Sequence, residues 1–93
     1  MEPIPHYVYI IRCDAYPSYK IGIAKNIEER VYGLQLGCPF ALHVVDSKRM
    51  DDRRTASKKE IELHDYFVKN EIGREWYSLN DKEIKMAKML LNR

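Results

Sequence analysis

Glu60 is the side chain whose position gives the strongest reason to expect chemistry. It falls within an apolar stripe with the spacing of a buried helix face, formed by Ala56, Leu63 and Phe67. An unpaired carboxylate is costly to bury, so the position predicts a cation, a backbone donor or a metal ion beside Glu60. The alternative is a purely structural role for Glu60, in a salt bridge to Arg30 or Lys20. His64 lies one helical turn further on the same side, whereas the competing Glu62 points away from the stripe.

Two short apolar segments near the start of the chain carry further candidates. Side chains two positions apart share one face of a β-strand. Lys20 and Gly22 therefore share a face, and alternation pairs Tyr9 with Lys20 rather than with Tyr19. Gly22 is interpreted as a strand-end bulge, as room for a substrate backbone to approach, or as both.

Basic side chains supply a third kind of candidate. Arg30 borders the apolar stripe of an expected helix. Its guanidinium either extends past this stripe to solvent or binds a phosphate through two N–H donors. Further along, basic residues cluster as Lys48, Arg49, Arg53, Arg54, Lys58 and Lys59. This cluster is either a solvated helix face or a patch that contacts phosphates. The net charge of +2 is too small to decide between the two.

The elements that position these residues begin with a β-hairpin. Residues 7–11 and 19–23 are expected to be strands, joined by a turn over residues 13–18. A helix is expected over residues 26–36, with Asn26 as its N-cap and Glu29 completing a capping box. Gly37 is expected to end this helix in the left-handed conformation.

The second half of the chain continues with a third strand over residues 41–45, extending toward Met50. A longer helix is expected from Asp51 or Asp52 to near Asn70, then an extended segment over residues 75–79. Asn80 and Glu83 predict a capping box for a last helix. The predicted fold class is α+β, a three-stranded, mainly antiparallel sheet flanked by three helices in the order β-β-α-β-α-(β)-α.

The bulk composition predicts one globular domain over residues 1–93. The hydrophobic fraction is 45% and the charged fraction 32%, unlike a disordered chain. No apolar run is long enough to span a bilayer, and no secretory leader opens the chain. Cys13 and Cys38 are too few for a disulfide framework. We therefore expect a cytoplasmic protein without a membrane partner.

Several short motifs occur in an order that resembles the GIY-YIG nuclease superfamily. They are Tyr7-Val8-Tyr9, Lys20-Ile21-Gly22, Ala24, Arg30, the helix from Ala56 to Phe67, and Glu75-Trp76-Tyr77. The likeness is strongest to the small branch found in phages and large viruses, in which the second motif reads Lys-Ile-Gly. It extends from about Tyr7 to Tyr77.

The resemblance implies a GIY-YIG-like domain that is a metal-dependent DNA endonuclease. Glu60 would bind Mg²⁺ or Mn²⁺, Arg30 would stabilise charge on the phosphate, and Tyr9 would orient or activate the attacking water. Lys20 would replace the second tyrosine and, as a nearby ammonium, lower the pKa of Tyr9. His64 would contact phosphate or transfer a proton. The substrate would also contact Gly22, Arg53, Arg54 and Lys58.

Two other functions stay open at this point. One is a nucleic-acid-binding module that does not cleave. The other is a protein-interaction or regulatory scaffold with an exposed aromatic surface formed by Tyr7, Tyr9, Tyr16 and Tyr19. The sequence does not choose between single- and double-stranded substrates or between DNA and RNA, and a protein partner would be one source of specificity.

Overall fold

The computed structural model describes residues 2–15 and 17–93, so Tyr16 in the expected turn lies outside the described residues. The elements in chain order are β1 (His6–Cys13), β2 (Ser18–Ala24), α1 (Ile27–Leu36), β3 (Leu42–Met50), α2 (Arg53–Tyr66), the 3₁₀ turn η1 (Val68–Asn70), β4 (Glu71–Gly73), β5 (Trp76–Ser78) and α3 (Asp81–Asn92).

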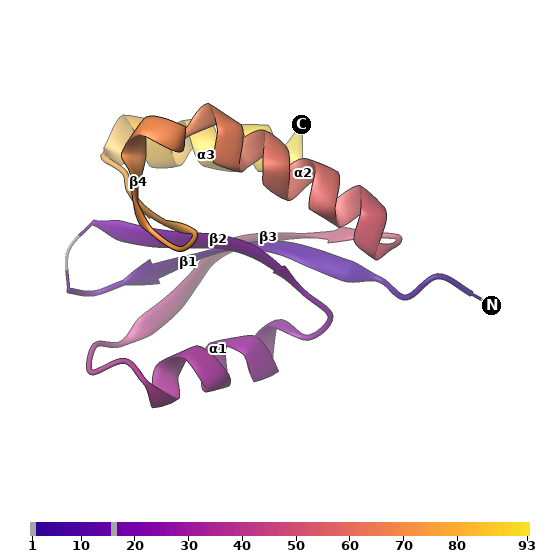
Figure 1. Cartoon of the computed structure of the whole chain (residues 1–93), viewed down its shortest axis with the longest axis horizontal. Coiled ribbons are helices and arrows are strands. Elements are labelled where there is room, and N and C mark those ends of the chain that lie inside the picture. Colours follow the sequence, from indigo (N-terminus) through magenta and orange to yellow (C-terminus); the bar gives the residue numbers. More distant parts are fainter. Residues whose placement is uncertain (1, 16) are drawn as a thin grey trace.

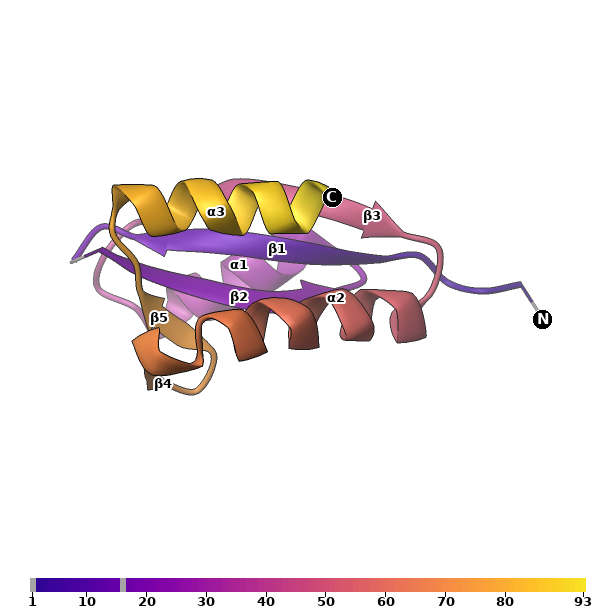
Figure 2. The ribbon, with the colours of Figure 1, turned by 90° about the horizontal axis from the view of Figure 1, so that it is seen from above.

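The elements form three layers around one antiparallel sheet with the strand order β3-β1-β2-β5-β4. Helix α1 covers one face, and α2 and α3 lie together on the other (Figure 1). Seen from above, α2 and α3 run alongside each other over the strands (Figure 2). The larger core lies beneath α2 and α3. The smaller core lies beneath α1, where it includes Tyr9 and Ile11.

The prediction of a three-stranded sheet is wrong, because the sheet has five strands. The additional strands, β4 and β5, are only three residues long each. Segments this short show no alternation that periodicity can detect. The expected extended segment over residues 75–79 is also shorter than predicted, because Glu75 belongs to the turn between the two strands.

The hairpin of β1 and β2 is in continuous register from Tyr7 opposite Ala24 to Cys13 opposite Ser18. Tyr9 lies directly opposite Gly22. A Cβ atom at Gly22 would lie 2.5 Å from the Tyr9 hydroxyl oxygen, closer than real Cβ atoms come to any heavy atom. The interpretation of Gly22 as a strand-end bulge is therefore wrong. Glycine is required here because the Tyr9 side chain crosses it.

Most helix boundaries agree with the sequence, with two exceptions. Asn26 caps α1 by accepting from the Glu29 amide, but the return bond of the predicted capping box is not among the hydrogen bonds of the described residues. Asp52 caps α2, and the capping box of Asn80 and Glu83 is complete. Gly37 has a φ of −100°, so the expected left-handed end is wrong. Helix α2 ends at Tyr66 and is followed by η1, rather than continuing to Asn70.

Helix α1 is held less firmly than the other two helices. None of its residues is fully buried, and its apolar side chains Ile27, Val31 and Leu34 are only partly covered by the smaller core. In contrast, α2 buries Ala56 and Leu63, and α3 buries three side chains.

Candidate functional site

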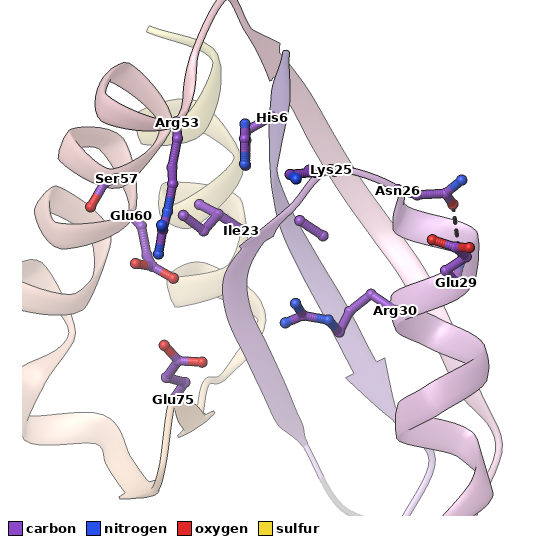
Figure 3. A pocket seen from close by; sticks show the side chains of 11 residues that line it. His6, Ile23, Lys25, Asn26, Glu29, Arg30, Arg53, Ser57, Glu60 and Glu75 are labelled. Carbon is purple, nitrogen blue, oxygen red and sulfur yellow. Dashed lines mark hydrogen bonds between the residues drawn. The ribbon is translucent and has the colours of Figure 1, made fainter. Parts of the chain in front are cut away.

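A cleft opens at the free part of strand β2. Residues 18–20 of this strand pair with β5, whereas residues 22–24 have no strand partner on that side among the described residues. Helix α1 and helix α2 reach this edge from opposite faces of the sheet, and their side chains converge across it (Figure 3). The cleft has a volume of about 760 Å³ and is lined by His6, Ile23, Ala24, Lys25, Asn26, Glu29, Arg30, Arg53, Ser57, Glu60 and Glu75.

Tyr9 and Arg30 are brought together beneath one wall of the cleft. The Arg30 Nη1 atom donates to the Tyr9 hydroxyl at 3.4 Å, and Tyr9 itself is 0% exposed. Burial raises the pKa of Tyr9 above its ordinary value of 10.0, and the Arg30 guanidinium opposes that rise. The phenol is therefore protonated at neutral pH, and its oxygen is held in place by a cation.

The sequence predicted the Lys20 ammonium beside Tyr9, but it lies beside Glu75 instead. Its ammonium Nζ is 3.1 Å from the Glu75 Oε1 atom and 5.7 Å from the centre of the Trp76 ring. Alternation places Lys20 on the same face as Tyr9, but its long side chain extends toward β5. The expected lowering of the Tyr9 pKa by Lys20 is therefore wrong, and Arg30 is the cation that contacts the phenol.

Glu60 is half-buried at the opposite wall, together with His64 and Glu75. One possible ligand atom from each of these residues lies within 4.8 Å of the others. Burial raises the pKa of Glu60; His64 opposes that rise and the Glu75 carboxylate adds to it. The described residues contain no salt bridge from Glu60 to Arg30 or Lys20. Glu62 points elsewhere, as expected, and pairs with Lys59 and Arg93.

The His64 side chain contacts two strands of the sheet. Its Nε2 atom lies 2.8 Å from the Ile21 carbonyl oxygen, so Nε2 carries the hydrogen that is donated there. Its ring also stacks on Tyr77 with centroids 5.5 Å apart. These contacts join α2 to β2 and β5 and so hold Glu60, one turn earlier on the same helix, at the cleft.

The donor set fits a divalent cation that prefers oxygen ligands. Mg²⁺ usually binds one or two carboxylates and keeps several waters. Glu60 and Glu75 offer two carboxylates at the edge of a cleft with room for water and phosphate oxygens. A cation between them would relieve the repulsion that contributes to the raised pKa of Glu60.

The predicted substrate-binding residues divide into two groups. Arg53 lines the cleft and points toward Glu60 (Figure 3). Arg54 and Lys58 instead line a neighbouring groove on α2, to which Arg53 and Ser57 also contribute. Arg53 therefore connects the two depressions. Gly22 does not line the cleft; the space above it is filled by Tyr9.

Eight of the residues that line the cleft were not among the predicted site residues, and His6, Ser57 and Glu75 are three of them. His6 begins β1, is 7% exposed, and is fixed by a hydrogen bond of 3.0 Å between Nδ1 and the Ile4 carbonyl. Ser57 lies one turn before Glu60 and shares its side of α2, a spacing that could have indicated it. The sequence marks Glu75 only as part of a motif, because no local pattern shows that a turn brings it to Glu60.

The described part of the chain contains no helix both long and apolar enough to cross a membrane.

Searches of curated proteins and of solved structures found no significant match. A scan against known domain families, in contrast, matches the T5orf172 domain over residues 6–91. This match covers nearly the whole fold, from the first residue of β1 to the last turn of α3. The chain belongs to the T5orf172 domain family.

Proposed function

We propose that this domain is a GIY-YIG-type nuclease that hydrolyses phosphodiester bonds of DNA with the help of a divalent metal ion. The observation that carries the proposal is the convergence of Arg30 and Glu60. They belong to helices on opposite faces of the sheet, and both reach one cleft. The T5orf172 match and the order of the sequence motifs support the same function.

The residues in and beneath the cleft have separate roles in the proposed reaction. The Arg30 guanidinium presents N–H donors to a phosphate and compensates the charge that develops during in-line attack. The Tyr9 phenol is protonated and 0% exposed, and its oxygen accepts from Arg30, so its role in this geometry is to position that guanidinium rather than to contact the attacking water. Glu60 would hold Mg²⁺ or Mn²⁺, which when bound would stabilise the charge on the phosphate and the leaving oxygen. Arg53 supplies a further cation at the wall formed by α2.

A cleavage assay with two matched variants tests this proposal. Purified protein with Mg²⁺ or Mn²⁺ is expected to nick supercoiled plasmid. Glu60→Gln should abolish nicking while far-UV circular dichroism stays unchanged. Glu62→Gln, on the same helix but paired with Lys59 and Arg93, should retain the wild-type rate. The absence of cleavage of single- and double-stranded DNA and of RNA with either metal would contradict the proposal, as would an active Glu60→Gln variant.

The second candidate is a nucleic-acid-binding module without cleavage. The buried, protonated state of Tyr9 favours it, because the phenol is poorly placed to act as a base. Binding without turnover, with affinity that falls steeply as salt rises, would identify this function. The scaffold with an exposed aromatic surface is not supported, since Tyr9 and Tyr19 are buried at 0% and 9% exposure.

A further inference from the structure

Glu75 reaches the cleft because the backbone before it follows an unusual path. Arg74 and Glu75 have φ angles of 36° and 71°, in the left-handed region that side chains rarely adopt. The Glu75 carbonyl accepts a hydrogen bond from the Ile21 amide at 3.1 Å. The Glu75 amide donates to the Glu71 carboxylate at 3.3 Å. Hydrogen bonds on both sides of the residue therefore fix the point from which its side chain extends.

Lys20 fixes the direction of that side chain. Its Nζ atom donates to Glu75 Oε1 at 3.1 Å and approaches the Arg74 carbonyl at 3.4 Å. The Lys20 side chain is only 10% exposed, whereas that of Glu75 is 43% exposed. The lysine is thus the buried and immobile partner, and the glutamate is the partner that faces the cleft.

We propose that Glu75 is a second carboxylate ligand of the metal ion, and that Lys20 is the residue that positions it. This inference rests on the nuclease function proposed above. Lys20 bonds Oε1 of the same Glu75 carboxylate that offers a ligand atom within 4.8 Å of those of Glu60 and His64. The lysine of the second motif therefore acts through Glu75 and not through Tyr9.

The physical basis is the orientation of a ligand before the metal binds. Carboxylates that bind metals are usually held by hydrogen bonds of their own, and losing such a partner typically weakens metal affinity about 10- to 100-fold. Without Lys20, the half-exposed Glu75 side chain would occupy several rotamers. Metal binding would then have to order it.

Direct titration of Mn²⁺ into the full chain, followed by electron paramagnetic resonance, tests this arrangement without any cleavage. Glu75→Gln and Lys20→Met are each expected to weaken Mn²⁺ binding by about 10-fold or more. Lys20→Arg should restore most of the affinity, because it keeps a donor for Glu75. The matched control is Lys59→Met, which removes another largely covered lysine side chain, 16% exposed and paired with Glu62 at 2.7 Å on α2. It should bind Mn²⁺ like the wild type.

Thermal unfolding without metal separates positioning from folding, since a variant that remains folded at the titration temperature reports binding alone. Lys20→Met that binds Mn²⁺ as tightly as the wild type, or more tightly, would show that the ammonium competes with the metal and would overturn the inference. If Glu60→Gln loses Mn²⁺ binding while Glu75→Gln keeps it, this inference fails alone. If the wild type binds no Mn²⁺, the metal-dependent nuclease function fails with it.

Discussion

Tyr9 and Gly22 face each other across the first hairpin, and the phenol of one occupies the space where the other has no side chain. This relationship fixes the Tyr9 hydroxyl within reach of Arg30, at 3.4 Å. The glycine of the second motif therefore makes room for the tyrosine of the first motif.

Gly22→Ala is expected to displace the phenol, because the new Cβ atom would lie 2.5 Å from its oxygen. We expect lower stability and loss of cleavage. Gly33→Ala is the matched control, since a Cβ atom there meets nothing within 4 Å and the residue lies inside α1. That substitution should stabilise the protein by roughly 0.5–1 kcal/mol. Urea unfolding of both variants measures these opposite signs, and equal effects would contradict the close approach.

Arg30→Lys tests whether the planar guanidinium is needed. A lysine keeps the charge but loses the fork that reaches phosphate and phenol together. If the proposed nuclease function is correct, the cleavage rate should fall by about 10²- to 10³-fold, as for other donors to a developing charge. The melting temperature should change little, since Arg30 is an exposed residue of α1. Arg12→Lys, in an exposed ion pair with Asp14, should leave the rate unchanged.

Leu63→Ala probes the core beneath helix α2. Leu63 is 0% exposed and packs between α2 and the sheet, so the truncation should cost about 2–5 kcal/mol of unfolding free energy. Ile61→Ala, at 52% exposure on the same helix, should change it by only about 0.5 kcal/mol. Chemical denaturation of the two variants checks this difference.

The raised pKa of Tyr77 predicts that the protein loses stability in alkaline solution. Burial, followed by the nearby carboxylates of Glu71, Glu75 and Glu60, raises the pKa of Tyr77 to about 12. A raised folded-state pKa means that this contribution is fully present below about pH 10, where the unfolded tyrosine titrates. It is then lost as the pH rises toward the folded-state value. Tyr77→Phe should reduce the slope of unfolding free energy against pH in this range, and identical slopes would contradict the prediction.

Asn80→Ala removes the N-cap of α3. The Asn80 side chain accepts from the Glu83 amide at 2.8 Å, and the Glu83 carboxylate accepts from the Asn80 amide at 2.9 Å. The loss should cost about 1 kcal/mol of stability without changing cleavage. Equilibrium unfolding together with the plasmid assay would measure both.

The sequence predicted best what depends on local patterns. The first hairpin, the caps at Asn26 and Asn80, and the inward stripe around Glu60 all follow from neighbours close in the chain. The hairpin of β4 and β5 was not predicted in full, because its strands are short and the turn between them uses positive φ at Arg74 and Glu75. No sequence periodicity signals such a turn.

The contacts of the candidate site show the same division. Alternation placed Tyr9 and Lys20 on one face, but face alone does not determine the partner of a long side chain. Lys20 pairs with the carboxylate of Glu75, which lies 55 residues further along the chain. Pairings at such separation depend on how the layers come together, and a single sequence does not reveal them.

The shallow burial of α1 has a consequence for how the protein would respond to heating. A helix without a fully buried residue belongs to the part of a fold that opens at the lowest free energy. Arg30 is carried by this helix, whereas Glu60 and Glu75 are held by α2 and the β4–β5 hairpin. Warming would therefore detach the arginine while the carboxylates stay assembled. The cleft would then keep its two carboxylates without the guanidinium.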